Sequence, residues 1–344
     1  MSQNLDTKSL AFTEEPKTTE NNDEDNSGVP SIIDDQLIYL SIAAIIGIVG
    51  NLVVMGKSIL FQRKSQRSSS NLTTISTYYF VLSLSISNLG TLTVSLAFYL
   101  LPYYISFPIT PFSCRYILPI RELFFAVSIF SITFIAMDRF LFLFKAYREK
   151  MTKHSYKICV IMLWVLSYLI MALPFSFVYK VVYVDGANVC DSMWNTETER
   201  RAHVTFIIVF NVSLPSFAII WSYVGSIRRL KKVQAESELP RRLIIVKSKR
   251  IVTVSVMMVV TFWITYTPYA SLVLLVEFGN LESSFFQQLN LELLHAISVC
   301  LLYSSAMVFP YILIFFSKPF QIRFFACRKI SQINGQRQEE DIDV

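Results

Sequence analysis

Long apolar blocks recur along this chain and are separated by short polar links. Seven blocks cover approximately residues 37–61, 75–104, 112–145, 156–180, 202–230, 248–278 and 287–316. Because an α-helix rises about 1.5 Å per residue, roughly 20 apolar residues cross the hydrocarbon core of a bilayer. Each block reaches that length, and no link is long enough to form a soluble domain. The pattern predicts an all-α membrane protein, a seven-transmembrane helix bundle over residues 37–316.

The segment before the first block has a different composition. Residues 1–36 hold nine acidic residues, two lysines and one aromatic residue. Such a segment cannot bury enough apolar surface to fold alone, so we expect it to be disordered. We assign the first block to a membrane helix rather than to a signal peptide, because it is longer than the apolar core of such a peptide.

An amphipathic pattern follows the seventh block. Phenylalanines share one face of a helix over residues 317–328, beginning with Phe320, and basic residues flank them. This pattern predicts a short amphipathic eighth helix at the boundary between membrane and water. Cys327 at its end is a candidate for palmitoylation, and a free cytosolic thiol is the alternative. Residues 329–344 are polar and are expected to form a cytoplasmic tail.

Lysine and arginine gather in alternate links between the blocks. They occupy the links after the first, third and fifth blocks, whereas residues 105–113 and 279–286 contain none. Because these residues accumulate on the cytoplasmic side of membrane proteins, we expect an extracellular N-terminus and a cytoplasmic C-terminus. The expected location is the plasma membrane.

The overall composition agrees with a membrane protein and argues against other classes. Hydrophobic residues make up 53% of the chain and charged residues 16%, against about 25% charged residues in soluble domains. The net charge of +6 comes from bases beside the membrane blocks, which we assign to topology rather than to nucleic-acid binding. Metal-binding, nucleophile-elbow and phosphate-loop motifs are missing from the sequence, so we expect no enzyme and no cofactor. We expect membrane lipid to surround the helix bundle.

Short motifs occupy fixed places within six of the blocks. They are Gly50-Asn51-Leu52-Val53-Val54 in the first, Cys114 and Asp138-Arg139-Phe140 in the third, Trp164 and Pro174 in the fourth, Pro215 and Tyr223 in the fifth, Phe262 and Pro268 in the sixth, and Pro310 in the seventh. The 25 residues from Cys114 to Arg139 correspond to about 37 Å of helix, which carries the thiol to one face and the arginine to the other. In this order and spacing, the motifs resemble those of rhodopsin-like (class A) G-protein-coupled receptors.

The resemblance implies a receptor that transduces an extracellular ligand to a heterotrimeric G protein. It implies that Asp138 restrains Arg139 at rest, and that Arg139 turns toward the G protein and Tyr223 in the active state. Tyr147 lies in the following loop, where the family has a bulky apolar residue. The other residues assigned to activation are Asn88, Phe262, Pro268 and Pro310, and the prolines are expected to kink their helices.

Three positions depart from the family pattern. Asn88 stands where the family has a buried Asp, and Tyr266 stands two residues before Pro268, where the family usually has Trp. The seventh block reads Phe309-Pro310-Tyr311-Ile312-Leu313, where the family has Asn-Pro-x-x-Tyr. These departures leave the fold prediction unchanged and imply altered contacts during activation.

The link between the fourth and fifth blocks carries features that concern the ligand. Asp185-Gly186 separates two β-prone runs, which predicts a β-hairpin. Cys114 and Cys190 lie on the oxidising outer side and are expected to form a disulfide, with two free thiols as the alternative. The hairpin and the spacing from Cys190 to Trp194 resemble those of neuropeptide receptors, which implies a peptide ligand. A hairpin that has no meaning for the ligand is the alternative.

Arg121 is the principal candidate for ligand binding. It lies seven residues after Cys114, nearly two full turns, so both side chains point the same way. A charged residue inside a membrane is costly and is a functional candidate by default, here for a ligand carboxylate or backbone carbonyl. The alternative is a structural ion pair with Glu277 or Glu292, because Glu122 is adjacent and is expected to point to another face. The remaining candidate ligand contacts are Tyr103, Trp194, Tyr266 and His295, together with Glu277 and Glu292.

Two other functions remain as alternatives at this point. A membrane transporter or channel also has several apolar spans, but inverted repeats and a midplane acid, which are typical of transporters, are missing from the sequence. A receptor-like protein that binds its ligand without signalling is the second alternative, because the Asn and Tyr of the seventh-block motif are replaced.

Overall fold

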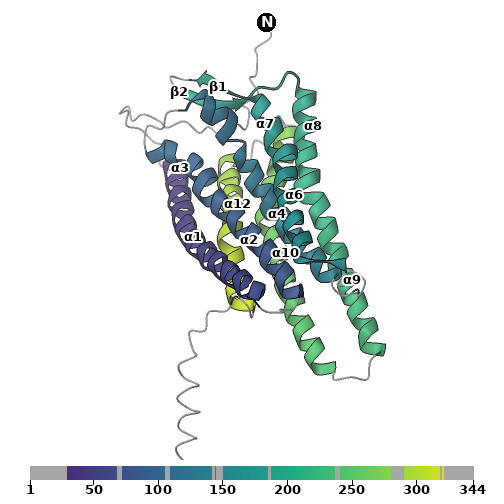
Figure 1. Ribbon diagram of the computed structural model, residues 1–344. Coiled ribbons are helices and arrows are strands. Elements are labelled where there is room, and N and C mark those ends of the chain that lie inside the picture. The colour runs from purple at the N-terminus through teal and green to yellow at the C-terminus, as the bar shows by residue number, and fades with distance from the viewer. Residues whose placement is uncertain are drawn as a thin grey trace, which may run out of the picture.

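The computed structural model describes residues 29–67, 72–104, 109–141, 144, 150–184, 187–236, 241–279, 290–317 and 320. Within these residues, seven long helical spans lie side by side in one bundle (Figure 1). All seven are long enough and apolar enough to cross a membrane. The predicted seven-transmembrane helix bundle is therefore confirmed.

Three of the spans are single helices. These are α1 (Val29–Arg67), α10 (Arg241–Phe278) and α12 (Leu291–Phe316). α1 begins before the predicted block, so residues 29–36, which we assigned to the N-terminal segment, are helical. One reason is a contact far along the chain, because Gln36 is buried and its amide donates to Tyr99 Oη at 2.7 Å.

The other four spans each contain a five-residue π-helical segment. The second consists of α2 (Leu72–Gly90), η1 (Thr91–Ser95) and α3 (Leu96–Tyr104), and the third of η2 (Ser113–Ile117) and α4 (Ile120–Leu141). The fourth consists of α6 (Lys153–Ser167), η3 (Tyr168–Ala172) and α7 (Leu173–Val178), and the fifth of α8 (Glu197–Ile208), η4 (Val209–Ser213) and α9 (Leu214–Glu236).

Side-chain caps fix where several spans begin. The Thr152 side chain accepts a hydrogen bond from the Ser155 amide at 3.2 Å before α6, and Thr196 accepts from the Glu199 amide at 3.2 Å before α8. Asn290 does the same for α12, at 3.0 Å. Each cap satisfies an amide that the helix itself leaves without a partner.

A β-hairpin covers one end of the bundle, which we call the hairpin end (Figure 1). Strands β1 (Tyr179–Val184) and β2 (Ala187–Ser192) pair antiparallel, with Val181 opposite Cys190. Cys190 forms a disulfide with Cys114, at the start of the third span, with 5.5 Å between the two Cα atoms. The predicted hairpin and disulfide are both confirmed.

Some predictions concern residues that lie outside the described ranges. They are the disorder expected over residues 1–28, Tyr147, Cys327, the cytoplasmic tail over residues 329–344 and nearly all of the amphipathic helix over residues 317–328. Phe320 is described and is fully buried, with its ring centroid 5.0 Å from that of Tyr78 on α2.

Close helix packing in the bundle depends on small residues. A Cβ atom at Gly90, at the end of α2, would lie 2.4 Å from Phe124 Cε1 on α4. That separation is far below van der Waals contact, so only glycine allows the ring to lie against this backbone. Gly56 on α1 is a natural comparison, because a Cβ atom there would have nothing within 4 Å.

We expect Gly90→Ala to lower the melting temperature of the purified protein, because overpacking a tight contact costs about 1–3 kcal/mol. Gly56→Ala serves as the control. It adds a methyl group in open space and gains about 0.5–1 kcal/mol of helix propensity, so its melting temperature should equal or exceed that of the parent. Equal melting temperatures for the two variants would contradict the packing described at Gly90.

Candidate functional site

A charged pair lies at the beginning of α4, in the hairpin end of the bundle. Arg121 is only 9% exposed. Its Nη2 and Nε atoms lie 2.9 Å and 3.0 Å from Glu122 Oε1. Our expectation that Glu122 points to another face was wrong. The Cβ atoms of neighbours do diverge, but both side chains are long enough to meet, and the burial of Arg121 makes a partner necessary.

Tyrosines from three other elements surround Arg121. Tyr179, the first residue of β1, is hydrogen-bonded to Arg121. Tyr269 of α10 and Tyr303 of α12 lie close enough to interact with its charge. Burial raises the pKa of Tyr179, against the opposing effect of Arg121, so its hydroxyl stays protonated and neutral. The pair of Arg121 and Glu122 has no net charge, so nothing in this arrangement requires an anionic ligand.

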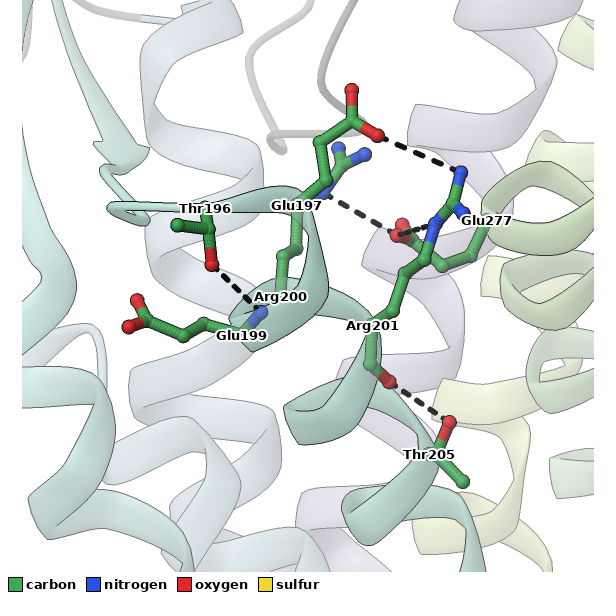
Figure 2. A network of polar contacts seen from close by, with 7 residues as sticks. All are labelled: Thr196, Glu197, Glu199, Arg200, Arg201, Thr205 and Glu277. Atoms are coloured by element: carbon green, nitrogen blue, oxygen red, sulfur yellow. Dashed lines mark hydrogen bonds and ion pairs between the residues drawn. The ribbon is translucent and has the colours of Figure 1, made fainter.

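The two glutamates that we considered as partners of Arg121 lie elsewhere. Glu277, near the end of α10, pairs with two arginines of α8 (Figure 2). Its Oε1 atom lies 3.4 Å from Arg200 Nε and 3.6 Å from Arg201 Nε. Glu292 is exposed in the first turn of α12. The acid that pairs with Arg121 is thus Glu122, which we had excluded from the sequence alone, and neither of these two glutamates.

An aromatic cluster connects the end of β2 to the surroundings of Arg121. The Trp194 ring lies 4.8 Å from His203 of α8, and His203 lies 4.7 Å from Phe175 of α7. Phe175 in turn stacks on Tyr179 at 5.3 Å. Trp194 was a candidate ligand contact, whereas His203 and Phe175 were not identified as such from the sequence, because their contacts join segments with no shared pattern.

Two further candidates lie at the same end of the bundle. His295 is partly buried one turn into α12. Tyr103 belongs to α3, but its side chain is outside what the structure describes.

Five buried side chains from five spans meet in the middle of the bundle, and we call them the central polar cluster. Asn88 donates to Asn51 Oδ1 at 3.2 Å and accepts from Ser128 Oγ at 2.8 Å. The Tyr266 hydroxyl is hydrogen-bonded to Ser128 and lies 3.3 Å from Ser305 Oγ. The cluster therefore joins Asn88 and Tyr266, two of the three places at which the sequence departs from the family pattern.

Two members of the central polar cluster make further contacts: Asn51 binds a backbone carbonyl, and the ring of Tyr266 packs against other aromatic rings. Asn51 also donates to the carbonyl of Ala306 on α12 at 2.8 Å. The rings of Phe125 and Phe262 lie 6.3 Å and 5.0 Å from the Tyr266 ring. Tyr266 thus contacts α4, α12 and its own helix, two residues before Pro268, which lies inside α10.

Asp138 and Arg139 lie at the opposite end of α4. Asp138 accepts hydrogen bonds from Ser76 Oγ at 2.7 Å and from Tyr156 Oη at 3.0 Å, and Arg139 donates to Thr77 Oγ1. These contacts tie α4 to α2 and α6. The sequence identified the two charged residues but not their three partners, which lie outside the motif.

The remaining residues assigned to activation are spread along three helices. Tyr223 of α9 is 39% exposed, Phe262 of α10 is buried, and Pro310 lies inside α12. Pro268 and Pro310 each remove a backbone donor from a long helix. Within the described residues, no group of three or more His, Cys, Asp or Glu side chains is placed to hold a metal ion.

Comparison with known proteins agrees with a seven-transmembrane receptor over most of the chain. The family described as "7 transmembrane receptor (rhodopsin family)" matches residues 50–313. Galanin receptor type 1 of Rattus norvegicus is 27% identical over 309 residues, which cover 85% of this chain and 82% of that receptor. The substance-P receptor of Aquarana catesbeiana is 23% identical over 293 residues, 83% of this chain and 68% of that receptor. A neuropeptide receptor of Caenorhabditis elegans is 21% identical over 233 residues, 53% of this chain and 51% of that protein.

The family match spans the motifs of the first to the seventh helix, and the structure places those motifs in one seven-helix bundle with a disulfide-linked hairpin. The chain belongs to the rhodopsin family of seven-transmembrane receptors.

Proposed function

We propose that this protein responds to an extracellular peptide and signals through a heterotrimeric G protein from the plasma membrane. The observation that carries the proposal is the buried Arg121, paired with the partly buried Glu122 beneath the hairpin. A buried charge is expensive within a membrane protein and marks a functional site by default. The relatives named for galanin and substance P support a peptide as the ligand.

The hairpin end is the extracellular end in this proposal. The links rich in lysine and arginine follow the first, third and fifth spans, and the hairpin lies between the fourth and fifth. Basic residues favour the cytoplasmic side, which leaves the hairpin outside. A disulfide such as the one between Cys114 and Cys190 persists in the oxidising extracellular environment, which agrees with a hairpin on the outer side.

The peptide meets the groups that converge beneath the hairpin. Arg121 offers donors, Glu122 offers acceptors, and the Trp194 ring, which packs against His203 of α8, offers an apolar face. His295 and Glu292 on α12 complete the candidate contacts. Since the charged pair is neutral as a whole, it suits backbone amides and carbonyls, which present donors and acceptors side by side.

Signalling then follows from a change in the population of two bundle arrangements. A ligand shifts that equilibrium only if it binds one arrangement better than the other. Tyr266 links the ligand end to the middle of α10, because its hydroxyl holds α10 to Ser128 of α4 and Ser305 of α12. Release of these bonds frees α10 to move at the end where Arg139 lies.

The proposal is tested by exposing cells that express the protein to a library of synthetic peptides, with a panel of G-protein dissociation sensors as the readout. We expect concentration-dependent responses that are lost in cells with the Arg139→Ala variant at equal surface level. Peptides that bind without any sensor response would support a non-signalling receptor-like protein instead. An ion flux or solute uptake without peptide would favour a channel or transporter.

Arg121→Ala is expected to lower the potency of an activating peptide by about 10- to 150-fold, because a charged hydrogen bond contributes about 1.5–3 kcal/mol. Arg121→Lys should restore potency only in part, since lysine lacks the planar fork of arginine.

The charge of Glu122 must also be removed, so that the loss of a ligand contact can be distinguished from a folding defect. Arg121→Ala leaves the partly buried Glu122 without its arginine, and this alone can reduce the surface level. The double variant Arg121→Ala, Glu122→Gln removes that cost and should reach the surface normally while potency stays low. Full potency of the double variant at normal surface level would rule out a ligand contact by Arg121.

Tyr266→Phe is expected to raise signalling in the absence of ligand, because it keeps the ring but removes the hydroxyl that holds α10 to α4 and α12. The control is Thr265→Val on the same helix. Thr265 is also buried, and its hydroxyl donates to the carbonyls of Thr261 and Phe262 in its own helix. Basal sensor signals at equal surface level provide the measurement, and equal signals for the two variants would contradict a role for the Tyr266 hydroxyl.

A further inference from the structure

Glu277 shares one carboxylate oxygen between two arginines at the hairpin end of the bundle. Arg200 and Arg201 come from the first turn of α8, and Glu277 comes from the last turn of α10 (Figure 2). The Glu277 side chain is nine-tenths buried, at 10% exposure, whereas that of Arg201 is 48% exposed. The buried member of this group is thus the acid.

The two arginines neutralise the charge of the Glu277 carboxylate, but they do not donate well-formed hydrogen bonds to its Oε1 atom. Its distances to Arg200 Nε and Arg201 Nε are 3.4 Å and 3.6 Å, whereas charge-assisted hydrogen bonds are about 2.7–2.9 Å long. The Oε1 atom is shielded from solvent, and no side chain or backbone group among the described residues donates a hydrogen bond to it. A buried acceptor in this condition gains when a better-placed donor arrives.

Arg201 has a second acid available to it. Its Nη2 atom lies 3.8 Å from Glu197 Oε2, one turn earlier on α8, and both side chains are largely exposed. Its guanidinium carbon also lies 5.8 Å above the Phe278 ring. Arg201 is therefore able to leave Glu277 without remaining unpaired, and Arg200 stays beside Glu277.

The turn that carries the two arginines is held firmly. Thr196 caps α8 by accepting from the Glu199 amide at 3.2 Å, and Thr205 Oγ1 donates to the Arg201 carbonyl at 2.8 Å (Figure 2). His203, three residues after Arg200, contacts Trp194. Glu277 consequently faces the same part of the hairpin end as the aromatic cluster of the proposed ligand site.

We propose that Glu277 is a subsite for a basic side chain of the peptide ligand, and that this side chain takes the place of Arg201. The inference rests on the proposed function and names the chemistry of one ligand group. A guanidinium suits the subsite best, because its planar fork reaches both oxygens of a carboxylate and supplies the hydrogen bonds that Oε1 lacks. Arg201 then pairs with Glu197, so no charge is stranded.

The test uses two matched peptide libraries on cells that express the full chain. One library carries an arginine at a fixed position in each peptide, and the other carries citrulline there, which has nearly the same shape but no charge. Both binding of fluorescent peptides and G-protein sensor responses are recorded. We expect the arginine peptides to bind about 10- to 100-fold more tightly than their citrulline partners, as a charged hydrogen bond predicts.

Receptor variants then assign this preference to Glu277. Glu277→Gln should abolish the difference between arginine and citrulline peptides. Arg201→Gln should enlarge it, because the competing guanidinium is gone. Glu199→Gln is the matched control: this acid lies in the same first turn and bonds to Asn195 at 3.2 Å rather than to the arginines, so the preference should not change. Surface levels are measured for every variant.

Several outcomes overturn the inference. Equal affinity of arginine and citrulline peptides, or a preference that survives Glu277→Gln, means that Glu277 does not receive a basic group. Equal losses for both libraries in Arg201→Gln mean that the three charges serve only to hold α8 to α10. Peptides that bind with the expected preference but elicit no sensor response overturn the proposed signalling and leave the subsite supported, whereas the absence of any peptide binding overturns both.

Discussion

A polar side chain inside a membrane bundle has little water to bind, so it must find its partner on the protein. This constraint explains how the described polar groups are distributed. They gather at three levels: Arg121 with Glu122 at the hairpin end, the central polar cluster in the middle, and Asp138 with Arg139 at the opposite end. The central level and the opposite level join helices that the apolar contacts alone would allow to slide, because hydrogen bonds are directional and dispersion contacts are not. The hairpin-end level joins α4 to β1, through the hydrogen bond between Arg121 and Tyr179.

In the central polar cluster, the two departures Asn88 and Tyr266 share one partner, because both are hydrogen-bonded to Ser128. Asn88 is neutral and finds both a donor and an acceptor, in Ser128 and Asn51. Tyr266 brings a hydroxyl to the same place, where the usual Trp of the family would bring an indole N–H, which only donates. A hydroxyl both donates and accepts, and it is therefore suited to the serines that surround it. The cluster is satisfied by neutral groups, with no acid at its centre.

Sequence patterns predicted the spans, the hairpin and the disulfide because each leaves a local or compositional trace. Apolar length identified the spans, and Asp185-Gly186 between β-prone runs identified the hairpin. Side-chain partners leave no such trace. Ser76 lies 62 residues from Asp138 in the sequence, and nothing in the motif points to it. The pairing of Arg121 with Glu122 was missed for a different reason, because the rule on neighbouring positions describes Cβ directions and not the reach of two long side chains.

The central claim is that a ligand at the hairpin end changes how α10 lies against the rest of the bundle. Spin labels at Val254 of α10 and Lys153 of α6 report the distance between these helices by double electron–electron resonance, in a protein whose cysteines outside the disulfide, Cys159, Cys300 and Cys327, are replaced by serine. We predict that an activating peptide raises the population of a longer distance, and that Tyr266→Phe raises it without peptide. An unchanged distance distribution at a peptide concentration that saturates the sensor response would contradict the account.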